Sequence, residues 1–326
     1  MNTRTKQLLL ILFLAVVIPT LLLGGYPKKV HVMQGETEQE HSTSNIKMPE
    51  KDNEIFISIL KDSDGQIMKL SLEEYILGVV LAEMPTEFEL EALKAQAVVA
   101  RTYALRRIEL GSKHFSAAVC TDSTCCQGYC TKENYLSSGG KEEALEKVSN
   151  AVLDTSGLVL TYNDVLAEAT YFSCSGGRTE DAQAVWGTDV PYLTVVDSPG
   201  EENAAHYTDT ITLSSAEFQN KLGEELAGNP SSWVGAITYT KGGGVDTISL
   251  AGNEYKGTLL RKKLGLRSTA FVITAVGSNI TITTKGFGHR VGMSQYGADA
   301  MALKGETYQQ ILSHYYPGTE LKIQDK

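Results

Sequence analysis

The 326-residue sequence is short of positive charge: 29 lysines and arginines stand against 39 aspartates and glutamates, a formal net charge of -10. No basic stripe offsets this balance, so the composition excludes a nucleic-acid partner and disfavours loose electrostatic attachment to an anionic membrane surface. A neutral polymer such as a sugar strand is compatible with it. The sequence also lacks a repeat of fixed period, while its hydrophobic content of 42% is enough for one large or two modest domains.

The N-terminal segment has no clear cleavage signal. Arg4 and Lys6 precede an apolar run over residues 8–23, and neither an Ala-x-Ala motif nor a cysteine for lipid attachment follows it. A run of this length lies between a signal-peptide core and a typical membrane-spanning helix. We expect an uncleaved transmembrane signal anchor over residues 7–25, with a cleaved signal peptide as the alternative. Positive charge before the run places residues 1–6 in the cytoplasm and everything after the anchor outside it.

The rest of the sequence divides into a polar segment and a folded domain. Residues 26–53 are rich in Gln, Glu, Ser and Thr with few aromatics, which is typical of a flexible linker. Residues 54–322 have helical patterns early and short strand-like runs later, with hairpin turns expected at 62–65 and 163–164 and a capped helix over 214–226. This pattern predicts an α+β domain of mixed helices and strands, with a central substrate cleft.

A proline separates two helical patterns next to one carboxylate, Glu83. Apolar residues at helical spacing lead up to Glu83, and Pro85 cannot continue that helix. A second helix is expected to restart at once, with Thr86 as its N-cap, Glu89 completing a capping box and Gly111 at its C-terminal cap. We therefore expect Glu83 at a break between two helices.

The sequence neighbours of Glu83 are apolar, namely Leu81, Met84 and Phe88. Apolar surroundings penalise the charged form of a carboxyl group and raise its pKa. A glutamate that stays protonated near neutral pH can serve as a general acid on a leaving group, and a glycosidic oxygen is the usual one. A solvated glutamate at a helix junction is the ordinary alternative.

One loop-like stretch, HFSAAVCTDSTCCQGYC, holds His114, Cys120, Cys125, Cys126 and Cys130. Outside the cytoplasm a disulfide such as Cys120–Cys130 can form, but the odd total of five cysteines and the adjacent pair argue against a fully bridged framework. Thiolates together with an imidazole suit zinc. Three interpretations therefore remain open: a zinc site, a disulfide or free thiols. A zinc site could also be catalytic, with the metal activating a water molecule.

Basic and glycine-rich segments offer further candidates for binding. Lys94 and Arg101 are seven residues apart, so both project from one face of the expected helix, although such residues are most often solvated or salt-bridged. Residues 171–177 read as a strand that runs into a glycine turn, and residues 286–297 as a glycine-rich loop before a helix. Small residues in such turns let backbone amides approach a ligand closely.

Three stretches together resemble the stage II sporulation protein D family. They are EMPTEFELEALKAQAVVARTYAL (83–105), YFSCSGGRTE (171–180) and GFGHRVGMSQYGADAMA (286–302), in that order. The resemblance covers roughly residues 50 to 320. It implies a membrane-anchored lytic transglycosylase of spore-forming bacteria, in which Glu83 matches the catalytic glutamate.

The resemblance also implies the residues that line the cleft. Basic residues in the helix after the catalytic glutamate are associated with activity in the family, and there the segment that matches residues 171–177 lies along the cleft. From its composition, the glycine-rich loop 286–297 is expected to present amides and side chains to sugar hydroxyls. The expected substrate-binding residues are Lys94, Arg101, Tyr171, Ser173, Ser175, Gly176, His289, Ser294, Gln295 and Tyr296. Two positions depart from the family pattern. Cys174 stands where a small hydroxyl residue is usual, as a replacement or as a partner for a loop cysteine, and Arg290 stands where glycine is common.

Some members of the resembled family carry a zinc site directly after the catalytic helix. His114, Cys120 and Cys126 align with its ligands, and either Cys125 or Cys130 could supply a fourth. Since this loop follows the helix that carries the cleft residues, we expect a structural zinc rather than a catalytic one.

The reaction that the resemblance implies needs one carboxyl group. Protonated Glu83 donates to the oxygen that links N-acetylmuramic acid to N-acetylglucosamine. Its carboxylate then accepts the proton of the muramyl 6-hydroxyl, which closes the 1,6-anhydro ring. Hydrolysis would need a second carboxylate, and no other Asp or Glu occupies a comparable motif.

The resemblance further implies a setting and partners. The substrate would be peptidoglycan strands stripped of peptide, cut in the space outside the membrane during engulfment in sporulation. A membrane-bound amidase and a membrane scaffold would be the partners, with no nucleic acid. Two alternatives remain: a non-catalytic module that binds glycan or enhances an amidase, and a zinc-dependent cell-wall hydrolase.

Overall fold

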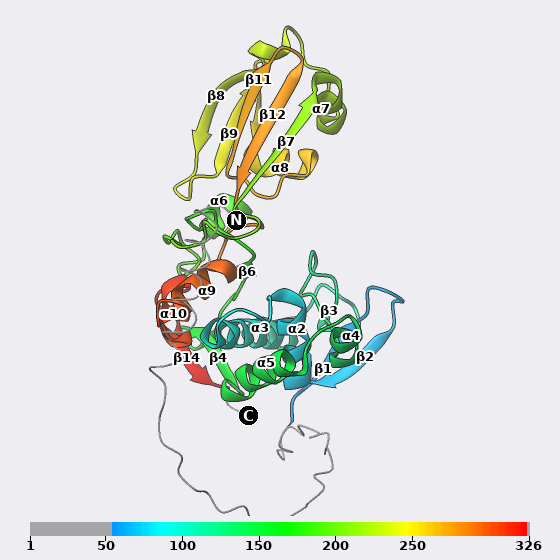
Figure 1. The fold of residues 1–326 in the computed structure, drawn as a ribbon, viewed down its shortest axis with the longest axis vertical. Helices are drawn as coiled ribbons and strands as arrows, with labels where there is room; N and C mark the ends of the chain where they lie inside the picture. Colours follow the sequence, from blue (N-terminus) through cyan, green and yellow to red (C-terminus); the bar gives the residue numbers. More distant parts are fainter. Residues whose placement is uncertain (1–53, 325–326) are drawn as a thin grey trace, which may run out of the picture. The chain divides into compact units, whose positions relative to one another are not determined.

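The computed structural model describes residues 54–324 (Figure 1). The expected cytoplasmic N-terminus (1–6), membrane anchor (7–25) and linker (26–53) lie outside these residues. Within the described part, no helix has both the length and the apolar composition that crossing a bilayer requires. Helices and strands are mixed along the chain, as the α+β expectation has it.

The described residues have two separate hydrophobic cores, and we name the two parts by their content. The helical lobe comprises residues 54–207 and 286–324, and the sheet lobe comprises residues 208–285. The chain enters and leaves the sheet lobe at one place, because Thr208 pairs with Lys285 across two of its strands. The domain expected over residues 54–322 therefore contains two cores.

Helix α3 (Leu90–Leu110) is the centre of the helical lobe, where it packs against α2, α5, α9 and α10 (Figure 1). The small sheets of this lobe have the strand orders β2-β1-β3, β13-β6 and β14-β4-β5. Its other elements are β1 (Phe56–Leu60), β2 (Ile67–Ser71), α2 (Leu72–Glu83), β3 (Val119–Cys120), α4 (Lys132–Ser137), α5 (Glu142–Asp154), β4 (Leu158–Tyr162), β5 (Val165–Leu166), β6 (Tyr171–Phe172), α6 (Ala182–Trp186), β13 (Met293–Ser294), α9 (Gln295–Ala302), α10 (Tyr308–Tyr315) and β14 (Glu320–Ile323).

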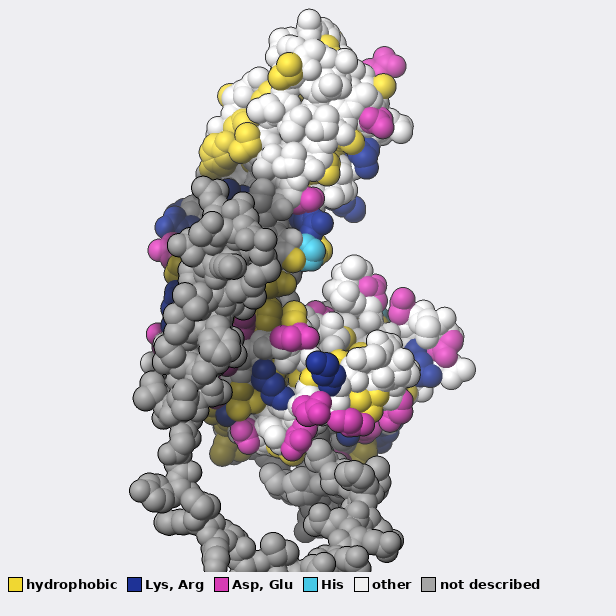
Figure 2. All heavy atoms as spheres, in the orientation of Figure 1, with side chains coloured by type: hydrophobic (Ala, Val, Ile, Leu, Met, Phe, Trp, Pro, Cys, Tyr) yellow, Lys and Arg dark blue, Asp and Glu magenta, His cyan; other side chains and the backbone are white. Residues whose placement is uncertain are grey.

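The sheet lobe consists of two antiparallel three-stranded sheets, β10-β9-β8 and β11-β12-β7. Alternate residues of β12, such as Ile280 and Ile282, are buried in its core, as expected for strands with one solvated face. Few charged side chains lie on the face of this lobe that Figure 2 shows. Its elements are β7 (Thr208–Ser214), α7 (Ser215–Leu222), the short 3-10 helix η1 (Pro230–Ser232), β8 (Val234–Tyr239), β9 (Val245–Leu250), β10 (Asn253–Lys256), α8 (Gly257–Leu264), β11 (Phe271–Val276) and β12 (Asn279–Lys285).

Several local expectations are confirmed. Strands β1 and β2 form the expected hairpin, with Gly65 at φ 70° in its turn, and Asn163 and Asp164 take positive φ between β4 and β5. Ser214 and Glu217 form the expected capping box at the start of α7. That helix ends at Leu222, four residues earlier than expected, because Gly223 takes the left-handed conformation that commonly ends helices.

The expected N-cap of α3 is wrong. Helix α2 ends at Glu83 as expected, but α3 begins only at Leu90, and the Thr86 hydroxyl lies 3.2 Å from the hydroxyl of Tyr135. Glu89 occupies the cap position without a side-chain hydrogen bond of its own. Its amide donates instead to Asp299 Oδ1 in α9 at 2.7 Å. A tertiary contact thus replaces the local capping box.

Candidate active site

Glu83 is the last residue of α2, at the break before α3. Met84 is extended (φ -119°, ψ 140°) and Pro85 has no amide hydrogen, so the helix cannot continue. The Glu83 side chain is half-buried, while the neighbouring side chains Met84 and Phe88 are buried in the core. The expected position of this carboxyl, between two helices and beside apolar residues, is confirmed.

The Glu83 carboxyl group accepts one backbone hydrogen bond, and two side chains with donor groups face it. The amide of Gly128 donates to Oε1 at 2.5 Å, and the side chains of Tyr171 and Gln295 face the same group. Burial raises the pKa of Glu83 above its ordinary value, and the three donors offset part of that rise because they favour the charged form. The net pKa is raised. Glu83 therefore keeps its proton more readily than a solvated glutamate. When it does ionise, nearby hydrogen-bond donors can stabilise the carboxylate.

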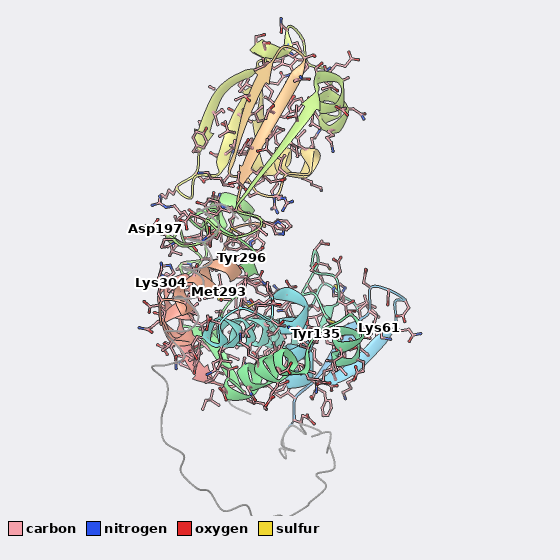
Figure 3. All side chains as sticks on the ribbon, viewed as in Figure 1. Lys61, Tyr135, Asp197, Met293, Tyr296 and Lys304 are labelled. Atoms are coloured by element: carbon pink, nitrogen blue, oxygen red, sulfur yellow. The ribbon has the colours of Figure 1, made fainter. Side chains whose placement is uncertain are left out.

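Gln295 begins α9 and brings an unsatisfied donor to the site. Its side chain is 5% exposed, and its Nε2 has no partner of good hydrogen-bond geometry among the described residues. A buried amide nitrogen without an acceptor is costly, so an oxygen of a substrate would be a favourable partner. The neighbouring Tyr296, which is labelled in Figure 3, packs edge-on against Phe88, with ring centroids 5.0 Å apart. Ser294 has a structural task, since its hydroxyl caps α9 at the amide of Gly297.

The loop after Cys126 contributes two residues that the sequence motifs do not indicate. Gln127 is buried between the hydroxyl groups of Tyr75 and Tyr171, and Gly128 is the donor to Glu83. A Gln-Gly pair in a polar loop carries no sequence signal for this placement. The loop therefore supplies part of the wall around the carboxyl group.

Lys94 and Arg101 both pair with carboxylates of the helical lobe. Lys94 Nζ pairs with Glu91 at 3.1 Å and with Asp154 at 3.0 Å. Arg101 is fully buried, and its guanidinium donates to both carboxylate oxygens of Glu73, at 2.9 and 2.6 Å. An enclosed guanidinium has no surface to offer a sugar. Arg101 is therefore the salt-bridged residue of the ordinary alternative, and Lys94 has two carboxylate partners within the lobe.

The turn after β6 is organised around one buried carboxylate, Glu201. Its Oε2 accepts from the amide and hydroxyl of Ser175, at 2.8 and 2.7 Å, and from the amide of Gly176 at 3.0 Å. The Cys174 thiol donates to the same oxygen at 3.3 Å, so Cys174 has no loop cysteine as partner. Ser175 and Gly176 thus shape the turn, and the half-buried Ser173 is the hydroxyl of this segment closest to solvent.

His289 lies among aromatic rings. Its imidazole centroid is 5.7 Å from that of Phe172 and 5.2 Å from that of Trp186. Burial, assisted by the positive charge of Arg261, lowers its pKa to about 4, so the ring is neutral at physiological pH. Its Nδ1 accepts from the amide of Val291 at 3.1 Å, so the hydrogen of the neutral ring is on Nε2.

Arg290 occupies a backbone position that suits glycine, at φ 67°. Its buried guanidinium donates to Glu180 Oε1 at 3.2 Å, to the Ser175 carbonyl at 2.7 Å and to the Gly242 carbonyl at 2.8 Å. Glu180 Oε1 also accepts from the amide of Gly244 at 2.8 Å. Because Gly242 and Gly244 belong to the sheet lobe, this pair joins the two lobes.

Four ligand-type residues converge in the loop after α3. The ligand atoms of His114, Cys120, Cys125 and Cys126 lie within 4.8 Å of one another, whereas Cys130 is outside the group. All five cysteines of the chain are free thiols. Three thiols and one imidazole are a donor set that fits tetrahedral zinc. The geometry thus selects Cys125 over Cys130 as the fourth member.

The sequence matches a protein-family model. The model, SpoIID, is described as "Stage II sporulation protein", and it matches residues 61–162. These residues include Glu83 and the whole Cys/His cluster.

Three named relatives extend the match. A stage II sporulation protein D of Bacillus amyloliquefaciens is 42% identical over 280 residues, which are 84% of this chain and 81% of that protein. A stage II sporulation protein D of Bacillus subtilis (strain 168) is 39% identical over 323 residues, 96% of this chain and 93% of that protein. An amidase enhancer of Bacillus subtilis (strain 168) is 30% identical over 302 residues, 75% of this chain and 40% of that protein.

Proposed function

The chain belongs to the stage II sporulation protein D family, and we propose that it is a peptidoglycan lytic transglycosylase with Glu83 as both general acid and general base. The observation that carries the proposal is the setting of the Glu83 carboxyl. Burial favours its protonated form, while the Gly128 amide and the Tyr171 and Gln295 side chains stand ready for the ionised form. A group that must first donate and then accept one proton needs both conditions.

The reaction proceeds in two steps that share this proton. Glu83 first protonates the oxygen between C1 of N-acetylmuramic acid and N-acetylglucosamine, and the C1–O bond breaks as positive charge develops at C1. The donors around Glu83 then stabilise its carboxylate. In the second step the carboxylate takes the proton of the muramyl 6-hydroxyl, and that oxygen bonds to C1. The products are an N-acetylglucosamine end and a 1,6-anhydro-muramyl end, and no water is consumed.

The surroundings of Glu83 favour this route over hydrolysis. Hydrolysis of a glycosidic bond generally needs a second carboxylate, as base or nucleophile. The groups that act on Glu83 in the described part of the chain are an amide N–H, a phenol and a carboxamide, with no second carboxylate among them. The unpartnered Nε2 of Gln295 is suited to an oxygen of the sugar, and Tyr296 and Ser173 lie beside it in the fold.

The Cys/His cluster has a supporting place in this proposal. His114, Cys120, Cys125 and Cys126 would hold zinc with four protein ligands, which leaves no open position for a water molecule and makes the metal structural. Zinc there would crosslink the loop whose next residues, Gln127 and Gly128, lie at Glu83. A zinc-dependent hydrolase is correspondingly disfavoured.

We propose the same setting that the family resemblance implies. The enzyme would be held by an anchor over residues 7–25 and would act outside the cytoplasmic membrane on peptide-stripped glycan strands during engulfment. Its partners would be a membrane-bound amidase and a membrane scaffold. The similarity to an amidase enhancer favours one rival, a module that binds glycan and stimulates an amidase without cutting.

Products distinguish these functions. Peptide-free glycan strands incubated with the protein from residue 27 onward should yield fragments with 1,6-anhydro ends, detected by mass spectrometry. Glu83→Gln should still bind the strands but release fragments at least about 1000-fold more slowly. Reducing ends that depend on zinc would point to hydrolysis. Binding without fragments, equal in wild type and variant, would establish the non-catalytic module.

A further inference from the structure

A buried carboxamide links two phenols next to Glu83. Gln127 is 1% exposed, and its Oε1 lies 3.2 Å from the hydroxyl of Tyr75 in α2. Its Nε2 lies 3.1 Å from the hydroxyl of Tyr171 in β6. Tyr75 is fully buried and Tyr171 is half-buried, and burial raises the pKa of each phenol well above its ordinary value, so both keep their hydrogens.

The chemistry of the carboxamide fixes the direction of both hydrogen bonds. An amide oxygen can only accept, so Tyr75 donates its hydrogen to Gln127 Oε1. An amide nitrogen can only donate, so Tyr171 accepts from Gln127 Nε2 with its oxygen. The single hydrogen of Tyr171 is then left for another acceptor. The Glu83 carboxyl group, which accepts from the amide of the adjacent Gly128, lies beside this phenol and is suited to accept that hydrogen.

The reverse arrangement would deprive Glu83 of that donor. If the side chain of Gln127 presented an oxygen to Tyr171, the phenol would give its hydrogen to Gln127. Glu83 would retain the Gly128 amide, while its second fixed donor would be lost. Donors that are oriented before charge develops contribute most to catalysis, because no reorganisation is needed at that moment.

We propose that Gln127 is a positioning residue, which holds the Tyr171 hydroxyl as a hydrogen-bond donor to the Glu83 carboxylate. This inference rests on the proposed function of Glu83. Its consequence is confined to the chemical step: the carboxylate left after proton donation is stabilised by a phenol whose orientation was set in advance. Gln127 need not contact the glycan, so its replacement should leave substrate binding intact.

The first test replaces Gln127 by a side chain of the same shape with two acceptors. In Gln127→Glu, both phenols can donate to the new carboxylate, and Tyr171 turns away from Glu83. We expect kcat for release of anhydro ends to fall about 100-fold, with KM within about twofold. Gln219→Glu is the matched control, because Gln219 also accepts a structural hydrogen bond, from the Leu226 amide, but lies in the sheet lobe. It should leave kcat unchanged.

The second test asks whether Gln127 acts through Tyr171. Tyr171→Phe should lower kcat by a similar factor, and the double variant should be no slower than the slower single one. Losses that multiply, or a rise in KM with kcat unchanged, would overturn the proposal. Tyr75→Phe offers a milder change if Gln127→Glu does not fold: the carboxamide is freed to turn over, and kcat should fall about threefold without adding to Tyr171→Phe.

The outcomes separate this inference from the proposed function. If Glu83→Gln retains wild-type release of anhydro ends, the role of Glu83 fails and this inference fails with it. A second outcome is that Glu83→Gln is inactive while Gln127→Glu and Tyr75→Phe keep wild-type kcat, with thermal unfolding showing that both variants are folded. In that case only the positioning role of Gln127 is wrong.

Discussion

The two lobes differ in what they bury. In the helical lobe the buried polar side chains include charged and carboxamide groups, namely Gln96, Arg101, Gln127, Glu180, Glu201, Arg290 and Gln295. In the sheet lobe, residues 208–285, the buried polar side chains are the hydroxyl residues Ser268, Thr269 and Thr284. Buried charges and amides are costly unless they are paired. In the helical lobe, several of these buried polar groups lie near Glu83 and in the turns that surround it. The sheet lobe has an apolar core, and its ion pairs lie on the surface.

Breaking one ion pair in each lobe should show this difference most strongly. Arg290→Met leaves Glu180 buried without its cation and should lower the free energy of unfolding by about 3 kcal/mol. Lys256→Met removes a partner of Asp246 from a pair in which both side chains are about half exposed, and should cost about 0.5 kcal/mol or less. Urea unfolding of both variants measures the two values. Equal losses would contradict the comparison.

Metal binding should distinguish two cysteines within the helical lobe. Cys125→Ser removes a member of the four-residue cluster and should weaken zinc binding on the order of 100-fold. Removal of a residue that only supports a metal ligand already costs up to about this factor, and Cys125 is itself a member of the cluster. Cys130→Ser lies outside the cluster and should bind zinc as the wild type does. Competition with a chromogenic chelator measures both affinities. The reverse ranking would make Cys130 the fourth ligand.

Between pH 6.5 and 4.5, histidine protonation should destabilise the chain through the helical lobe, because the sheet lobe contains no histidine. The folded pKa of His289 is lowered from 6.5 to about 4 by burial. Between these values the unfolded chain binds a proton that the folded chain does not, so stability is present above pH 6.5 and is lost as the pH falls. We expect a loss on the order of 2 kcal/mol from this group. In His289→Gln, the urea unfolding midpoint should depend less on pH between pH 6.5 and 4.5. An unchanged pH dependence would refute the assignment of this loss to His289.

A methyl group added at Gly128 should lower activity, whereas one added at Gly235 in the sheet lobe should not. A Cβ on Gly128 would lie 3.0 Å from Glu83 Oε1, so Gly128→Ala should displace the carboxyl and lower kcat about 10-fold. A Cβ on Gly235 would lie 3.2 Å from the Ser249 Cβ in the sheet lobe, and Gly235→Ala should leave kcat unchanged. Rates of anhydro-end release on glycan strands measure both. Full activity in Gly128→Ala would show that this contact is unimportant.

The sequence could predict features that depend on neighbours in the chain. The break at Pro85, the turns at Gly65 and Asn163 and the cap at Ser214 follow from local conformational preferences, and all are confirmed. The catalytic candidate, Glu83, likewise belongs to a motif of residues that are contiguous in the chain. Its raised pKa followed from apolar residues beside it in the sequence, although the structure adds donors from loops far along the chain.

The features that escaped prediction depend on distant contacts. Local preferences indicate Thr86 as the cap, and nothing in the sequence indicates that Asp299, 210 residues after Glu89, is the acceptor. Arg101 looked available to a substrate because its partner Glu73 belongs to another helix. Gln127 has no motif at all, since its role comes from two phenols that α2 and β6 bring to it.

The contact between Glu89 and Asp299 has a consequence for biosynthesis. The amide at the start of α3 finds its acceptor only in α9, and Glu91 in the first turn of α3 accepts from the amide of Tyr308 at 2.8 Å. Asp299 follows Glu89 by 210 residues and Tyr308 follows Glu91 by 217 residues, so a ribosome makes both partners long after α3. A nascent chain that stops before residue 299 therefore leaves the helix beside Glu83 without its N-terminal support. Maturation of the site is thus tied to synthesis of α9 and α10, and its full assembly waits until both helices have emerged from the ribosome.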